Sequence, residues 1–187
     1  MPIKIFVDMG HNPVGPNAGA EGNGYTEFEL TYNIGRRLAA LLNANPDFEA
    51  ITSHTSPSQV LGTSNSTSLQ TRVRAANNWG ADYYISLHTN ASTITSASGV
   101  EGYAYSEGSQ GYVLGEYITE SLSDITGLEN RGMFVRPSLY VLRRTRMPSV
   151  LIEMGFISNA EDANLMATMP DTFARGIYNG ILRYFGL

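Results

Sequence analysis

Cysteine is absent from this 187-residue chain, and long apolar runs and long basic runs are absent too. The lack of cysteine excludes disulfide bonds, thiolate metal sites and a cysteine nucleophile. No basic run is longer than Arg143-Arg144 and the formal net charge is −5, so neither nucleic acid nor an anionic membrane is expected as the main partner. No stretch is apolar and long enough to cross a bilayer, so no membrane insertion is expected.

Three local signatures of common enzymes are also missing. The chain has no Gly-x-Ser-x-Gly elbow, which argues against a serine esterase. The first strand-like run is not followed by Gly-x-Gly-x-x-Gly, which argues against a dinucleotide-binding domain. His-Glu-x-x-His is absent as well, which excludes a metalloprotease site carried on one helix.

Hydrophobic spacing predicts strands separated by helices. Strands are expected at 3–7, 48–52, 83–88, 99–105, 139–142 and 150–153. Helices are expected at 27–43, 69–79, 112–125 and 161–166, and in a terminal segment with the stripe Phe173, Ile177, Ile181 and Phe185. This alternation favours parallel pairing in an α/β fold, and the length favours one domain over residues 1–187.

The connecting segments have their own signals. Thr26 is a predicted helix N-cap, with Glu29 as its capping-box partner. The glycines and prolines between residues 10 and 24 argue against regular structure there. The stretch 53–68 is rich in serine and threonine and is predicted to be a polar loop.

Two of the three histidines follow strand-like runs. His11 comes directly after Val7-Asp8-Met9-Gly10, and His88 ends the run 83–88. If the two strands lie parallel in one sheet, both imidazoles reach the edge at which open α/β sheets bind ligands. Because imidazole is the commonest metal ligand, this pair predicts a metal site. His54, in a polar loop, is interpreted as a structural histidine.

A catalytic zinc site needs a third protein ligand and an open position. Glu27 is the best candidate, since it begins the first helix directly after the loop that starts at His11; a stabilising charge at the helix N-terminus is its alternative role. Glu153 follows an apolar run and could act as a general base and then as an acid, or could pair with an arginine such as Arg143 or Arg144. Together these four residues describe metal-assisted hydrolysis of an amide.

Longer segments make a family resemblance visible. They are Val7 to His11, Gly24 to Glu27, Arg72 to Asn77, Ala81 to Ala91, Gly99 to Glu101, Leu139 to Arg143 and, most specific, Pro148 to Asn159. In these segments the chain resembles the zinc-dependent N-acetylmuramoyl-L-alanine amidases of the amidase-3 type, found in bacterial cell-wall hydrolases and phage endolysins. The resemblance runs from residue 3 to the C-terminus. It implies a twisted, mostly parallel sheet flanked by helices on both faces.

The resemblance also implies an activity and a site. It implies hydrolysis of the amide between N-acetylmuramic acid and L-alanine in peptidoglycan, with one Zn²⁺ ion held by His11, Glu27 and His88 and with Glu153 as the catalytic carboxylate. Asp8 and Asn90 lie beside the ligands and would either orient them, contact substrate or hydrogen-bond a turn. The alternative is a catalytically inactive domain of the same fold that only binds the cell wall.

Some positions depart from the family pattern. Met9 and Asn12 replace a proline and a glycine, which we interpret as loop variation, and Ser53-His54 replaces an arginine near the sheet edge.

The expected place of action is the cell wall. The segment Met1 to Lys4 lacks the apolar core of a signal peptide, so export would depend on a holin, on mother-cell lysis or on a missing N-terminal segment. The resemblance also leaves room for a cell-wall-binding module outside this sequence.

Overall fold

One six-stranded sheet organises the fold in the computed structural model, which describes residues 1–187. Its strands lie in the order β4-β1-β5-β8-β6-β7. The strands are β1 (Ile3–Met9), β4 (Phe48–Thr52), β5 (Tyr83–Asn90), β6 (Val100–Ala104), β7 (Asn130–Val135) and β8 (Ser149–Phe156). All neighbouring pairs are parallel except β6 and β8, which are antiparallel.

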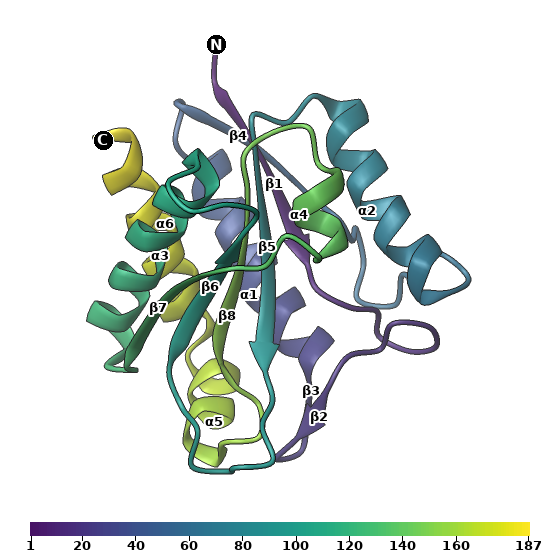
Figure 1. Cartoon of the computed structure of the whole chain (residues 1–187), viewed down its shortest axis with the longest axis vertical. Coiled ribbons are helices and arrows are strands. Elements are labelled where there is room, and N and C mark those ends of the chain that lie inside the picture. The colour runs from purple at the N-terminus through teal and green to yellow at the C-terminus, as the bar shows by residue number, and fades with distance from the viewer.

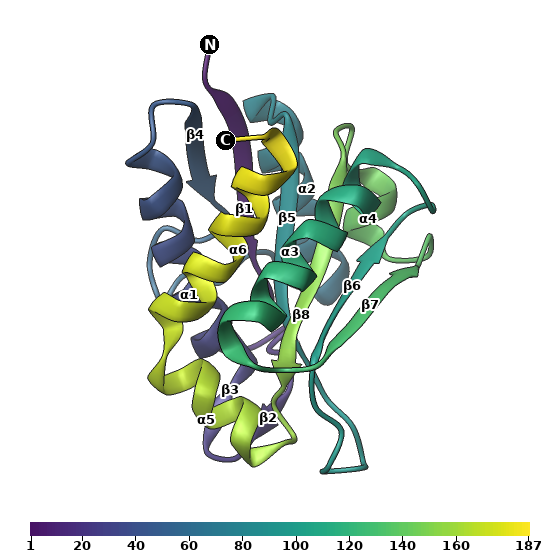
Figure 2. The same ribbon diagram turned by 90° about the vertical axis from the view of Figure 1, so that its left-hand side faces the viewer.

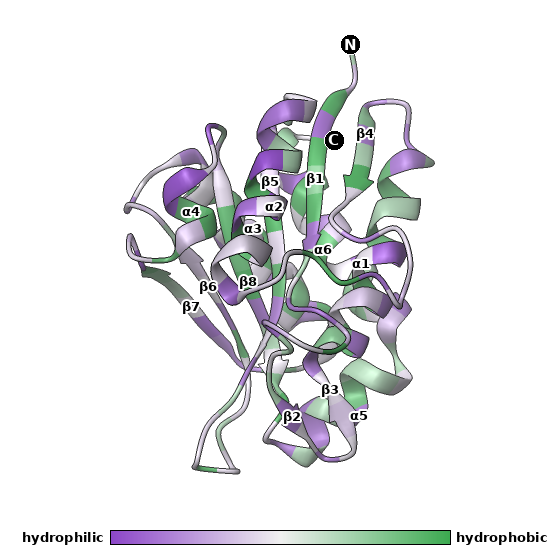
Figure 3. Cartoon of the chain, turned by 90° about the vertical axis from the view of Figure 1, so that its right-hand side faces the viewer, coloured by the Kyte–Doolittle hydropathy of each residue, from purple (hydrophilic) through white to green (hydrophobic).

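Helices cover both faces of this sheet, but unequally (Figures 1 and 2). One face packs against α1 (Glu27–Asn43), α3 (Gln110–Thr126), α5 (Ala160–Thr168) and α6 (Pro170–Phe185), which share a cluster of 24 buried hydrophobic residues with the strands. The other face packs against α2 (Asn65–Trp79) and the short α4 (Tyr140–Arg144), with a cluster of eight. Figure 3 shows the hydrophobic residues running along the central strands. The predicted α/β fold with a mostly parallel sheet is therefore confirmed.

The helix that carries Glu27 begins as the sequence predicts. The Thr26 hydroxyl accepts a hydrogen bond from the Glu29 backbone N–H, and the Glu29 carboxylate accepts one from the Thr26 backbone N–H. This reciprocal cap satisfies two N–H groups that a helix start leaves unpaired. It fixes Glu27 as the first residue of α1, above the carboxyl ends of β1 and β5.

The strand predicted at 139–142 is wrong: this segment forms α4, which spans Tyr140–Arg144. A run of four apolar residues fits a buried strand and a buried helical turn equally well. Here Val141 and Leu142 pack with Leu151 in the smaller cluster, and this tertiary packing favours a helix over a strand. Strand β7, in contrast, was not predicted, because Asn130–Val135 is an edge strand with a glycine and no alternation of apolar and polar residues.

Two loops contain more structure than predicted. Helix α2 begins at Asn65 rather than at Leu69, because Ser64 and Thr67 form a reciprocal cap within a stretch that is typical of loops. Strands β2 (Glu21–Gly22) and β3 (Tyr25–Thr26) form a small antiparallel hairpin in the glycine-rich loop. Its turn residues Asn23 and Gly24 both have positive φ, as a two-residue hairpin turn of this type requires.

None of the helices is long and apolar enough to cross a membrane.

Candidate metal centre and catalytic carboxylate

The two predicted histidines lie side by side at one edge of the sheet. Strands β1 and β5 are parallel neighbours, with Met9 opposite Leu87, so His11 and His88 come together although they are far apart in sequence. Their ring centroids are 4.8 Å apart. His88 is not at the end of its strand as predicted, because β5 continues to Asn90. His11 lies two residues beyond β1 in the left-handed region, with φ of 69°, a conformation uncommon for a side-chain-bearing residue and frequent at functional sites.

Glu27 bridges the two imidazoles. Its Oε2 lies 3.2 Å from His11 Nε2, and its Oε1 lies 3.0 Å from His88 Nδ1. The carboxylate also accepts the backbone N–H groups of Ala20 and Thr89, at 2.9 and 3.0 Å. Burial raises the pKa of this carboxyl, but the hydrogen bonds and charges of the two histidines outweigh burial and hold the pKa well below its usual range. Glu27 is therefore held as a buried carboxylate.

These three side chains could hold a metal ion, because one ligand atom from each lies within 4.8 Å of the others. Zinc bonds to nitrogen and oxygen of about 2.0–2.2 Å place neighbouring tetrahedral ligands roughly 3.3–3.6 Å apart. The separations of 3.0 and 3.2 Å between Glu27 and the two imidazoles come near that spacing. Two imidazoles and one carboxylate are also a donor set that zinc favours, so residues and spacing both fit.

Two glycines let the imidazoles take these positions. A Cβ atom at Gly10 would lie 2.6 Å from His88 Cε1, and one at Gly19 would lie 2.6 Å from His11 Cγ. Both distances are far below van der Waals contact, so larger residues at these positions would displace the histidines.

Asp8 supports the His11 backbone through Arg72. The Arg72 guanidinium is buried and donates to Asp8 Oδ1 at 2.7 Å, to the Met9 carbonyl at 2.6 Å and to the His11 carbonyl. Asp8 Oδ2 accepts from Tyr84 and Ser86, each at 2.7 Å. Burial raises the Asp8 pKa, but Arg72 and these hydroxyls together hold it well below its usual range. Asp8 thus bonds to no imidazole, and Arg72 holds the backbone of a candidate ligand.

Glu153 lies next to this group within β8, directly opposite His88 on one side and Glu101 on the other. Its Oε2 is buried and has no hydrogen-bond partner. No ion pair joins it to Arg143 or Arg144, the alternative that its sequence context left open. Burial raises the pKa of the Glu153 carboxyl well above its usual range, and the charges of Glu27 and Glu101 raise it further. A buried carboxyl oxygen without a hydrogen-bond partner is costly, which points to a role in chemistry.

Asn90 and His54 lie in other networks. The Asn90 side chain donates to Glu101 Oε1 at 2.7 Å and does not bond to either imidazole. His54 is buried, with its Nε2 3.2 Å from Asn12 Oδ1 and its ring 4.9 Å from that of Phe28. Burial and the charge of Arg72 lower the pKa of His54 to about 4, although Asp8 acts in the opposite direction. His54 therefore packs beside the loop of His11 without joining the candidate ligands.

A small cavity adjoins both histidines. Its volume is about 120 Å³, and carbon atoms make up most of its wall. Its lining comes from α2, from α4 with the preceding Leu139, from strands β1, β5 and β8, and from the loop after β1. The residues that line it are Asp8, Gly10, His11, Asn17, Leu69, Arg72, His88, Leu139, Tyr140, Val141 and Leu151. A small apolar group could therefore lie directly beside the candidate metal centre.

Residues 5–183 match the protein family described as N-acetylmuramoyl-L-alanine amidase. The chain belongs to this family. The amidase CwlM of Bacillus licheniformis is 35% identical over 189 residues, which cover 99% of this chain and 70% of CwlM. The amidase LytC of Bacillus subtilis is also 35% identical, over 97% of this chain but only 35% of LytC.

Solved structures agree with this assignment. The structure of an N-acetylmuramoyl-L-alanine amidase from Clostridium difficile 630 superposes with a TM-score of 0.86 at 28% identity, over 99% of this chain and 97% of that one. The relatives also include an endolysin of Bacillus phage SPP1, which is 31% identical over 94% of this chain and 62% of its own length. The family and the enzyme class predicted from the sequence are therefore confirmed, and this amidase has the peptidoglycan amidase activity of its family.

Proposed function

We propose that this amidase hydrolyses the bond between N-acetylmuramic acid and L-alanine with one zinc ion, which His11, Glu27 and His88 would hold. The observation that carries the proposal is the position of these three side chains, with one ligand atom from each within 4.8 Å of the others, beside Glu153, whose Oε2 is buried and unpartnered. Family membership supports the substrate, and the donor set supports the metal.

When bound, zinc supplies Lewis acidity that makes a water molecule more acidic and polarises the carbonyl of the scissile amide. We propose that Glu153 takes a proton from the attacking water and later delivers it to the alanine nitrogen as the carbon–nitrogen bond breaks. Burial and the charges of Glu27 and Glu101 raise the pKa of Glu153, which is the direction that favours a carboxyl group that accepts and returns a proton. Arg72 and Asp8 would act indirectly, by fixing the backbone of His11.

The place of action and the extent of the catalytic unit belong to the same proposal. We propose that residues 1–187 act as one catalytic domain at the cell wall. A catalytically inactive domain that only binds the wall is the second candidate. No specific feature of the site favours it, because all four proposed side chains are present and close together.

Metal content and cleavage of a soluble muropeptide test the proposal together. We expect wild type purified without chelator to contain about one zinc ion per chain and to release peptides with N-terminal L-alanine from MurNAc-L-Ala-D-Glu. The variant His88→Ala should lose both zinc and activity. The variant Glu153→Gln should keep zinc but lose roughly 10²–10⁴-fold in kcat.

Two results would contradict the proposal. If wild type binds no zinc, the proposed metal centre is wrong. If Glu153→Gln has an unchanged kcat, the proposed catalytic role of Glu153 is wrong. Binding to walls without release of peptides would favour the inactive domain.

A further inference from the structure

Positive charge is concentrated in one part of this acidic chain. Residues 130–152 contain five arginines and no aspartate or glutamate, whereas the formal net charge of the whole chain is −5. The segment comprises β7, the following turn, α4 and the start of β8. Four of its arginines, at positions 136, 143, 144 and 146, are exposed and form no ion pair with a carboxylate. The surface formed by these exposed arginines is therefore suited to an anionic partner.

One of these arginines, Arg136, is held against the exposed face of β6 and β7 by two aromatic rings. The Arg136 guanidinium lies over the rings of Tyr103 and Phe134, at 5.2 and 5.8 Å from their centroids. Stacking orients a guanidinium and leaves the N–H groups along its edge free. The Arg136 guanidinium donates one hydrogen bond within the protein, from Nη1 to the Val135 carbonyl at 3.2 Å. The other donors remain available to a planar oxyanion such as a carboxylate.

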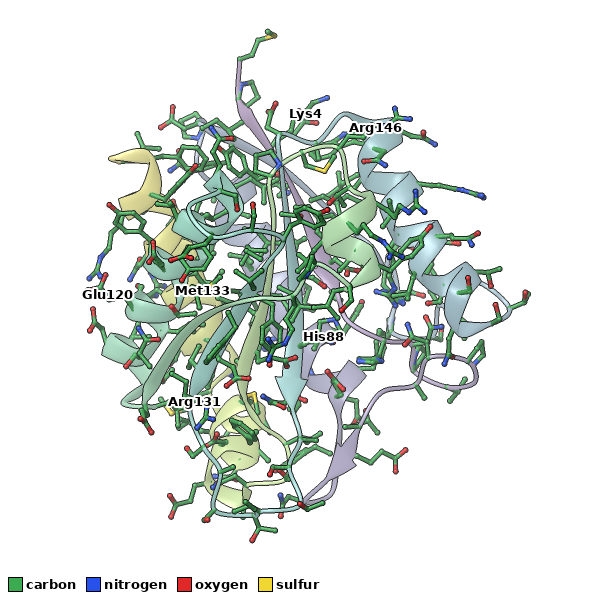
Figure 4. The ribbon with its side chains drawn as sticks, in the orientation of Figure 1. Lys4, His88, Glu120, Arg131, Met133 and Arg146 are labelled. Carbon is green, nitrogen blue, oxygen red and sulfur yellow. The ribbon has the colours of Figure 1, made fainter.

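The sheet register places Tyr103, on which Arg136 stacks, near Glu153. Glu101 lies directly opposite Glu153, and Tyr103 is two residues further along β6, so all three side chains project from the same face. From the spacing of strands and residues, the Cα atoms of Tyr103 and Glu153 are about 8 Å apart. Figure 4, in which His88 and Arg131 are labelled, shows that no helix covers β6 and β7 on this side.

The carboxylate that contacts Tyr103, that of Glu101, is already paired with an arginine. Arg131 Nε donates to Glu101 Oε2 at 2.7 Å, and Glu101 Oε1 accepts from Asn90 and Tyr103. Glu101 therefore does not compete for Arg136, which keeps its charge for a ligand.

We propose that Arg136, on its platform of Tyr103 and Phe134, binds a carboxylate of the peptide stem of the substrate. This rests on the proposed function. The glycan carries no charge, because the carboxyl of muramic acid is consumed in the scissile amide, so the peptide stem is the anionic part of the substrate. Two residues of extended peptide span about 7 Å, close to the roughly 8 Å between the Cα atoms of Glu153 and Tyr103, so the free carboxylate of the second residue is the one that we assign to Arg136.

The test uses two muropeptides that differ only in this group, MurNAc-L-Ala-D-Glu and its D-isoglutamine form, in which the α-carboxylate is an amide. We expect wild type to cleave the carboxylate form with a kcat/KM roughly five to twenty times higher, as for loss of one charge-assisted contact. Arg136→Gln should reduce this preference to within about twofold, and Arg136→Lys should restore part of it, since lysine keeps the charge but not the planar geometry.

Arg146→Gln is the matched control. It removes the same charge from the same segment, but Figure 4 shows Arg146 at the end of the sheet away from His88. This variant should keep the wild-type preference. Zinc content measured on every variant separates a binding effect from damage to the metal centre.

The outcomes distinguish the inference from the proposed function. Wild type that cleaves neither muropeptide would overturn both. Wild type that cleaves both equally, or an Arg136→Gln variant that still discriminates, would overturn only the role of Arg136. If Arg136→Gln lost activity only on walls that carry phosphodiester polymers, with unchanged discrimination between the muropeptides, the ligand would be that polymer and the inference would be wrong.

Discussion

The two faces of the six-stranded sheet differ in what their side chains do. Four helices cover one face, where a cluster of 24 buried hydrophobic residues contains no charged group. The other face has a hydrophobic cluster of eight residues under α2 and α4, and beyond it lie Asp8, His88, Glu101 and Glu153. Because strand side chains alternate between faces, each strand contributes to both regions. The comparison shows how one sheet can separate stability from chemistry.

Asp8 is an exception to this separation. It lies on the same face of the sheet as His88 and Glu153 but has a structural role. We expect Asp8→Asn to lower the free energy of unfolding by about 3–5 kcal/mol, because it leaves the buried Arg72 without its carboxylate. Urea unfolding measures this loss. Ser86→Ala, which removes one hydrogen bond from the same carboxylate, should cost about 1 kcal/mol. If the two variants were equally stable, the Asp8–Arg72 pair would not be the anchor that we describe.

Substitutions on the face covered by four helices should change the stability of the protein but not its activity. Ile177 on α6 is completely buried in the larger cluster, and Ile177→Ala should lower the free energy of unfolding by about 3 kcal/mol through lost burial and a cavity. The kcat/KM of the folded variant should remain unchanged. Arg175→Ala, at an exposed position of the same helix, is the control and should stay within about 0.5 kcal/mol of wild type. A large change in kcat/KM for Ile177→Ala would show that the two faces are coupled.

The smallest expected effect concerns pH and His54. Its pKa is about 4 in the folded protein, compared with 6.5 for the unperturbed group. Between these values the unfolded chain binds a proton that the folded chain does not, so stability falls as pH decreases from 6.5 towards 4. At pH 5 this loss amounts to about 2 kcal/mol relative to pH 7.

The variant His54→Gln isolates this contribution. Its stability should fall less than that of wild type between pH 7 and pH 5, as measured by urea unfolding at each pH. The lowered pKa of Asp8 does not interfere, because its stabilising effect is lost only below the usual range of an aspartate. An identical pH dependence for wild type and variant would mean that His54 is protonated in the folded state.

The sequence alone determined the elements with strong local signals. The capping box at Thr26 and Glu29 and the regular stripe of α6 depend only on neighbouring residues, so they could be predicted. The grouping of His11, Glu27 and His88 could also be predicted, because parallel strands bring their carboxyl ends to one edge. Their roles as ligands, and that of Glu153 in catalysis, stay predictions.

Tertiary structure decided what local patterns leave open. It made residues 140–144 a helix, because packing against Leu151 outweighs the strand-like composition. It placed Glu101 opposite Glu153 through an antiparallel pairing that no spacing along the chain reveals. It also joined Arg72 to the carbonyl of His11 across 61 residues and placed Arg136 over Tyr103. These contacts depend on strand order and on packing between distant segments, and a local sequence pattern contains neither.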